Sequence, residues 1–83
     1  MSSIHPGLVL IMQRFPAEKD HLRRMYLSDP SFQIICDDYQ QCMQALAFWR
    51  RSADEQAPER FREYQSLRND LEGEIEEHIG TMR

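Results

Sequence analysis

Hydrophobic residues recur every three or four positions through the middle of the chain. They fall at Phe32, Ile35, Tyr39, Cys42, Leu46 and Trp49. This alternating spacing of three and four is the heptad pattern of an amphipathic helix that packs against another helix. Asp29 and Pro30 stand in front of the pattern as an N-cap carboxylate and a proline at the first helical position, which together predict a helix over 29–52.

A second apolar stripe of the same kind follows the polar stretch 52–57. Its members are Phe61, Tyr64, Leu67, Leu71, Ile75, Ile79 and Met82. Pro58 is a favourable residue for the first helical position, so we expect a helix over 58–80. Because the two helices have similar lengths and a short polar connection, the pattern predicts an all-α fold built on an antiparallel two-helix hairpin.

A shorter apolar pattern precedes the hairpin and starts at Phe15-Pro16. Its apolar members are Leu22, Met25 and Tyr26. This pattern predicts a short N-terminal helix over 16–27, which ends there because the residue before the next proline disfavours the helical region. We therefore expect 15–83 to form a single helical-hairpin domain and 1–14 to form an apolar N-terminal arm.

The apolar face of the helix 29–52 is wider than one partner helix can cover. At ~100° per residue it spans about 160° once Cys36, Met43 and Ala47 are included, whereas the face of the helix 58–80 spans about 120°. The excess width must therefore be covered by the N-terminal residues, by a second subunit, or by both.

Large apolar residues outside these faces predict contacts with other chains. Ile34 and Phe48 fall on the far side of the first long helix, and the run LVLIM lies in the N-terminal arm. We expect a homodimer whose paired hairpins approach a four-helix bundle, together with an unidentified protein partner. The predicted contact residues are Leu8, Leu10, Ile11, Ile34, Phe48 and Trp49, with the tryptophan as an anchor. Two interpretations of the arm stay open, because it either folds back over its own hairpin or docks on another chain.

Several short motifs follow one another in an order that resembles a known family. They are Phe15-Pro16 ahead of the short helix, Asp29-Pro30-Ser31-Phe32, Tyr39 seven residues later, and LEGEI at 71–75. In these motifs the stretch 15–79 resembles the YdcH-like family of small bacterial helical-hairpin proteins, whose function is uncharacterised. This chain departs from the family pattern at Cys42, where leucine is usual, and at Arg50, where glutamate is frequent. The resemblance implies a self-associating helical hairpin without catalytic residues.

Charge and composition narrow the classes of partner. Ten basic against fourteen acidic residues give a net charge of −4, which does not favour binding to the phosphate backbone of a nucleic acid. No stretch approaches the roughly 20 apolar residues of a membrane span, and the N-terminus lacks the basic region of a secretion signal. We therefore expect a cytoplasmic protein with reduced thiols that binds neither nucleic acids nor membranes.

Cys42 is the first candidate for a reactive group. Cys36 lies six positions, or about 600°, before it on the predicted helix, so the two thiols cannot form a disulfide within one helix. The register of the hairpin places Arg68 opposite Cys42, and a nearby guanidinium would lower the thiol pKa and give a redox-sensitive thiolate. The alternative is a buried thiol that acts as a small hydrophobic residue while Arg68 extends its head group to solvent.

Glu74 and His78 are weak candidates for metal ligands because residues four apart share a helix face. The Glu-x-x-His motif of di-iron proteins fails at His78, since position 75 is isoleucine, and Glu18 and His21 have this spacing only once, on a single short helix. No glycine-rich phosphate loop or nucleophile motif occurs. We therefore expect no cofactor and no enzymatic activity. The sequence predicts a small interaction or regulatory protein that acts through apolar helix faces. The alternative is a metal- or redox-responsive regulator with its site at the dimer interface.

Overall fold

The computed structural model describes residues 4–81, and every regular element in that range is a helix. The helices are α1 (Pro6–Arg14), the 3-10 helix η1 (Pro16–Glu18), α2 (Lys19–Ser28), α3 (Pro30–Arg51) and α4 (Ala57–Thr81). The prediction of an all-α chain is confirmed. The outermost residues of the predicted arm and domain, 1–3 and 82–83 with Met82, lie outside the described range. None of the described helices has both the length and the apolar character of a membrane span.

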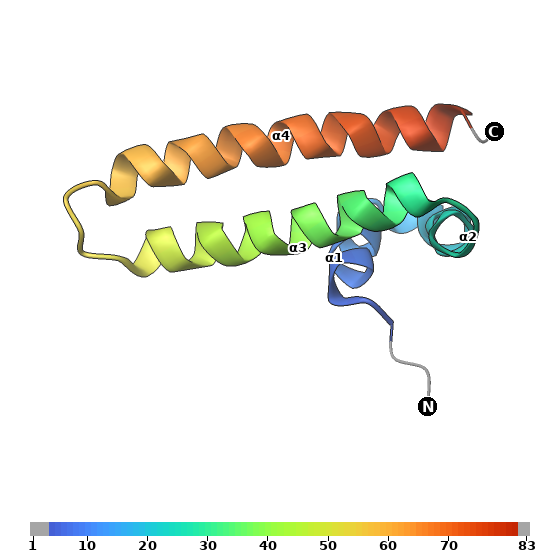
Figure 1. The fold of residues 1–83 in the computed structure, drawn as a ribbon, viewed down its shortest axis with the longest axis horizontal. Helices are drawn as coiled ribbons and strands as arrows, with labels where there is room; N and C mark the ends of the chain where they lie inside the picture. The colour runs from blue at the N-terminus through green and yellow to red at the C-terminus, as the bar shows by residue number, and fades with distance from the viewer. Residues whose placement is uncertain (1–3, 82–83) are drawn as a thin grey trace.

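The long helices α3 and α4 lie side by side and run in opposite directions, joined by the short loop 52–56 (Figure 1). The start of α3 is fixed by the cap that the sequence predicted. One carboxylate oxygen of Asp29 accepts hydrogen bonds from the backbone N–H groups of Ser31 at 2.9 Å and Phe32 at 3.4 Å. Such a cap satisfies amide groups that have no partner inside the helix.

The helices α1 and α2 pack against only one half of the hairpin. Figure 1 shows them beneath the half of α3 where that helix begins, whereas the end next to the loop has no helix beneath it. The predicted N-terminal arm is therefore a helix of the chain's own core, with Leu8, Ile11 and Met12 all buried. Of the two interpretations of the arm, the structure shows the one in which it folds back over its own hairpin.

Close packing of α1 on α3 depends on Gly7. A Cβ atom at this position would overlap the backbone carbonyl oxygen of Cys36, so only glycine fits the crossing. His5 caps the start of α1, because its Nδ1 accepts a hydrogen bond from the N–H of Gly7 at 2.9 Å. The other ring nitrogen of His5 contacts the carboxylate of Asp37 on α3. These contacts fix the first turn of α1 on α3.

The hydrophobic core is concentrated at one end of the hairpin. We call this the four-helix end, made of α1, α2 and residues 30–42 and 68–81, and we call residues 43–67 the loop end. The buried core side chains are Leu8, Ile11, Met12, Leu22, Met25, Phe32, Ile35, Cys36, Tyr39, Cys42, Leu46, Leu71, Ile75 and Ile79. Of these, Leu46 alone belongs to the loop end, where Ala57 is the other buried residue. The two ends therefore differ in how well their apolar residues are covered.

Candidate interaction surface

The predicted contact residues separate into two groups. Leu8 and Ile11 are 3% and 0% exposed in the chain's own core, and Leu10 is half-buried against it. This corrects the assignment of Leu8 and Ile11 as contacts with another chain, because α1 uses them to cover part of the wide apolar face of α3. The assignment of the half-buried Leu10 stays a prediction. Ile34 and Phe48 belong to the second group, since 61% and 63% of their surface is exposed.

The exposed group belongs to a second heptad pattern on α3, which we call the outer stripe. Its members are Ile34, Asp38, Gln41, Ala45 and Phe48, with spacings of four, three, four and three. At ~100° per residue these five positions fall within an arc of about 80°. Ala45 is half-buried and the other four are exposed. The outer stripe is thus a continuous strip of α3 surface that the described helices leave open.

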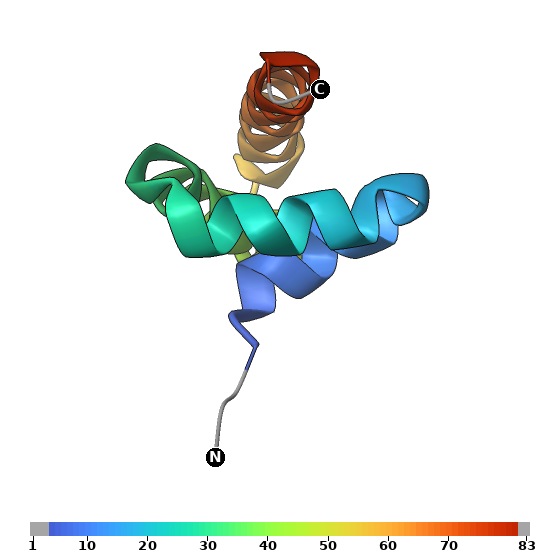
Figure 2. The ribbon, with the colours of Figure 1, turned by 90° about the vertical axis from the view of Figure 1, so that its right-hand side faces the viewer.

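The outer stripe points away from α1 and lies beside α4. Gly7 of α1 packs on Cys36, and Cys36 lies about 160° around α3 from Ile34 at ~100° per residue. Figure 2 looks along the hairpin and shows α2 extending from the start of α3 to one side only. The described residues therefore leave the outer stripe accessible to another molecule at four of its five positions, and they cover Ala45 in part.

A groove between α3 and α4 runs beside the outer stripe. Its lining residues are Asp38, Gln41, Cys42, Ala45, Tyr64, Leu67 and Leu71. Three of these belong to the outer stripe, and Leu67 on α4 is 43% exposed. The predicted apolar stripe of α4 is therefore incompletely covered at Leu67. We use the name outer face for the outer stripe together with Leu67.

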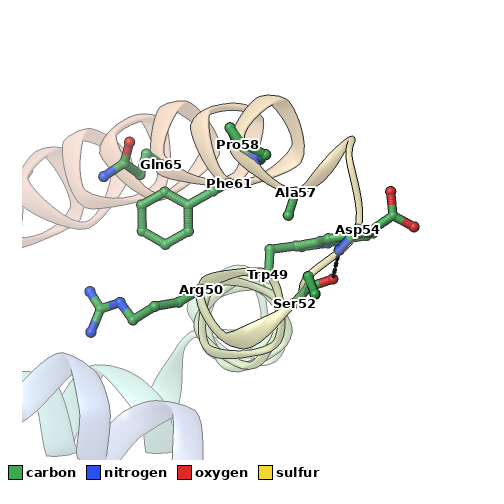
Figure 3. Close-up of a pocket in the computed structure, with 9 residues that line it drawn as sticks. Trp49, Arg50, Ser52, Asp54, Ala57, Pro58, Phe61 and Gln65 are labelled. Carbon is green, nitrogen blue, oxygen red and sulfur yellow. Dashed lines mark hydrogen bonds between the residues drawn. The ribbon is translucent and has the colours of Figure 1, made fainter.

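Trp49 occupies a concavity at the hairpin loop (Figure 3). Its side chain extends from α3 toward Ala57 and is half-buried. The edge of one ring meets the face of the other between Trp49 and Phe48, with ring centroids 5.0 Å apart and an interplanar angle of 89°. Such edge-to-face contacts favour one relative orientation of the rings. Trp49 thus contacts Phe48 and is less exposed than it.

Cys42 is a buried thiol that donates a hydrogen bond to the backbone carbonyl of Tyr64 at 3.2 Å. Burial raises the pKa of this thiol, the guanidinium of Arg68 lowers it by a smaller amount, and the carboxylate of Glu72 raises it further. Arg68 thus acts in the predicted direction, but the net pKa is above the ordinary value. The direction of the pKa shift is opposite to the one that a reactive thiolate at Cys42 requires, and burial of the thiol is the larger cause. The reactivity of Cys42 stays a prediction.

Cys36 shows the same effect more strongly. Its side chain is fully buried under α1, and burial together with the negative charge of Asp37 raises the pKa of the thiol to about 12. Both cysteines are free thiols in the structure. They pack as small hydrophobic residues, which was the alternative interpretation of the sequence.

A polar contact between three helices was missed by the sequence analysis. The hydroxyl of Tyr39 on α3 donates a hydrogen bond to Oε2 of Glu72 on α4 at 2.9 Å, and Nε of Arg14 on α1 lies 3.3 Å from the same oxygen. Burial and the contact with Glu72 raise the pKa of Tyr39 far above its ordinary value. The position of Tyr39 inside the apolar stripe could have indicated this contact, because a buried hydroxyl needs a hydrogen-bond partner on a neighbouring helix.

Glu74 and His78 do not form a pair of ligands. Nδ1 of His78 lies 2.9 Å from the backbone carbonyl oxygen of Glu74, and Nε2 lies 3.8 Å from the carboxylate of Asp29. Residues 4–81 contain no group of three or more histidine, cysteine, aspartate or glutamate side chains that could hold a metal ion. His78 instead connects the end of α4 with the start of α3.

Comparisons of this chain with protein-family models, with curated proteins and with solved structures find no match. The resemblance of residues 15–79 to the YdcH-like family therefore stays a prediction. The outer face of the hairpin is the feature on which a proposal about function rests.

Proposed function

We propose that this chain is a small, non-enzymatic interaction protein that associates with a second copy of itself through the outer face of its hairpin. The observation that carries this proposal is the exposure of two large apolar side chains, Ile34 and Phe48, on the same side of α3. Full burial of such a side chain stabilises a protein by about 1.5–3 kcal/mol. Association of two copies would bury both residues of each chain, which gives the free energy that a small hairpin lacks on its own.

The length of the outer stripe supports the same proposal. Ile34 at the four-helix end and Phe48 at the loop end are both exposed, so the open side of α3 extends over both ends of the hairpin. A second hairpin packed along this side would give the four-helix arrangement that the sequence predicts.

The state of the titratable groups fits a protein without chemistry of its own. Burial raises the pKa values of Cys36, Cys42 and Tyr39, so all three groups stay protonated near neutral pH. A protonated thiol is a poor nucleophile and a poor metal ligand. The proposal keeps the cytoplasmic location predicted from the sequence, where free thiols remain reduced.

Sedimentation equilibrium over a range of concentrations tests this proposal. The wild-type chain should show a mass approaching twice its 9.9 kDa, and Phe48→Ser should shift the equilibrium toward the single chain. Leu27→Ser is the matched control, because Leu27 is 79% exposed but lies on α2, outside the outer face. A single-chain mass for the wild type at every concentration would contradict the proposal, as would equal dissociation of the two variants.

A further inference from the structure

The outer stripe has a symmetric order of residues. Gln41 is its centre, and the large apolar residues Ile34 and Phe48 lie seven positions before and after it. Between centre and ends stand Asp38 on one side and the small Ala45 on the other. A stripe with large apolar residues at both ends and a polar amide in the middle is complementary to its own reverse, as a two-fold contact between identical chains requires.

We propose that the α3 helices of two copies pair antiparallel about a two-fold axis at Gln41, an inference that rests on the proposed self-association. In this arrangement Ile34 packs against the partner's Phe48, and Phe48 packs against the partner's Ile34. Gln41 faces Gln41 of the partner subunit, where two amides can donate to and accept from each other. Ala45 faces the partner's Asp38. The alanine side chain is small, so the carboxylate of that aspartate can remain hydrated.

Charges beside the outer stripe favour this orientation. Asp37 and Arg51 lie on the same flank of α3, about 40° apart at ~100° per residue. Equivalent flanks of two antiparallel helices face each other, so Asp37 lies toward the partner's Arg51. The carboxylate of Asp37 contacts His5 of its own chain, but the side chain stays 59% exposed, so the partner's Arg51 can reach it. The rise of 1.5 Å per residue separates these two positions by about 9 Å along the helix axis, which an extended arginine side chain can span. A parallel pair would instead place Asp38 against Asp38 of the partner subunit, and like charges repel.

Polar residues at the centre give the pairing its register. A purely apolar stripe would tolerate a shift by one heptad, whereas a shift here would place Gln41 against a large apolar residue of the second copy. A buried amide without a partner costs about 1–3 kcal/mol, so the aligned register is favoured. Gln41 is therefore a specificity-determining residue of the contact, and Ile34 and Phe48 supply its apolar area.

Cysteine cross-linking of the full chain tests the geometry. Gln41→Cys should form a reducible covalent dimer under mild oxidation, because facing positions at a two-fold axis bring the two Cα atoms within the ~7 Å that a disulfide needs. The wild-type chain is the background, since Cys36 and Cys42 are 0% and 1% exposed. Gln41 lies on the exposed surface of α3, as do Ile34 and Phe48, so cysteine at any of these positions should leave the fold intact.

A mixture of two further variants gives the matched control. Ile34→Cys and Phe48→Cys should cross-link to each other when mixed, but neither should cross-link alone, because the two copies of position 34 are about 21 Å apart along the antiparallel axis at 1.5 Å per residue.

A dimeric mass for Gln41→Cys without a covalent dimer would overturn the antiparallel pairing and leave self-association standing. Rapid cross-linking of Ile34→Cys alone would overturn it in favour of a parallel pair. A single-chain mass for the wild type would overturn both proposals.

Discussion

The four-helix end and the loop end carry similar apolar patterns but cover them to different degrees. Phe32 at the four-helix end is fully buried, whereas Phe48 on the same helix at the loop end is 63% exposed. The difference arises because Phe32 lies on the face of α3 that packs against the other helices, whereas Phe48 lies about 160° around α3 from it, on the outer stripe. Ile34 shows the same effect at the four-helix end, where it is 61% exposed on the outer stripe. The comparison shows that the hairpin has more apolar surface than its own helices cover, and that the excess faces outward along α3.

Alanine at the two phenylalanines should give the largest contrast between the ends. Phe32→Ala should lower the free energy of unfolding by about 3–5 kcal/mol, because it leaves a cavity where a fully buried ring was. Phe48→Ala should change the stability of the single chain by no more than about 0.5 kcal/mol, since the ring lies largely in water. Urea unfolding at a concentration low enough to dissociate any dimer measures both values. Equal losses would contradict the difference in cover.

Glycine substitutions test the crossing that creates the four-helix end. Gly7→Ala should cost about 1–3 kcal/mol of unfolding free energy, because the new Cβ meets the Cys36 carbonyl and must push α1 away from α3. Gly73→Ala is the matched control on α4, where nothing lies within 4 Å of an added Cβ. This control should gain about 0.5–1 kcal/mol from the better helix propensity of alanine. Thermal unfolding of both variants measures these changes. A Gly7→Ala variant as stable as the wild type would show that α1 does not pack tightly on α3.

Alkaline pH should weaken the four-helix end by a smaller and graded amount. The thiol pKa of Cys36 is about 12 in the folded chain, against an ordinary value of 9.0 in the unfolded chain. The unfolded state therefore loses its proton first, so this contribution to stability is fully present below about pH 9 and is lost as the pH rises toward 12. Thermal midpoints between pH 7 and pH 10.5 measure the trend. In Cys36→Ala the thermal midpoint should fall less steeply with pH than in the wild type. An equal slope in both proteins would contradict the assignment of this effect to the Cys36 thiol.

The long helices could be predicted from the sequence because their signals are local. Heptad spacing and the Asp29-Pro30 start predicted a helix over 29–52, and the structure has Pro30–Arg51. The second helix was predicted over 58–80 and observed over Ala57–Thr81. The excess width of the first apolar face also predicted that further cover was needed. That inference came from helix geometry alone and did not depend on the identity of the covering element.

The position of α1 and the state of Cys42 could not be predicted in the same way. The packing of α1 depends on Gly7 meeting the Cys36 carbonyl, a contact between residues far apart in sequence that no local pattern encodes. The register did place Arg68 near Cys42, but the net pKa depends on how deeply the thiol is buried, and burial outweighs the guanidinium. Both outcomes are set by tertiary packing and not by spacing along the chain.

The tryptophan emission of the chain reports on the outer stripe most directly. Trp49 is the single tryptophan, and its ring contacts Phe48. Ile34 of the same chain lies about 21 Å from Phe48 along α3 at 1.5 Å per residue, so it cannot affect the emission directly. In the antiparallel dimer, however, Ile34 packs against the partner's Phe48. Dilution of the wild type should therefore shift the emission of Trp49, and Ile34→Ser should show the emission of the diluted protein already at high concentration. Identical emission of Ile34→Ser and wild type at every concentration would contradict the pairing of the two helices.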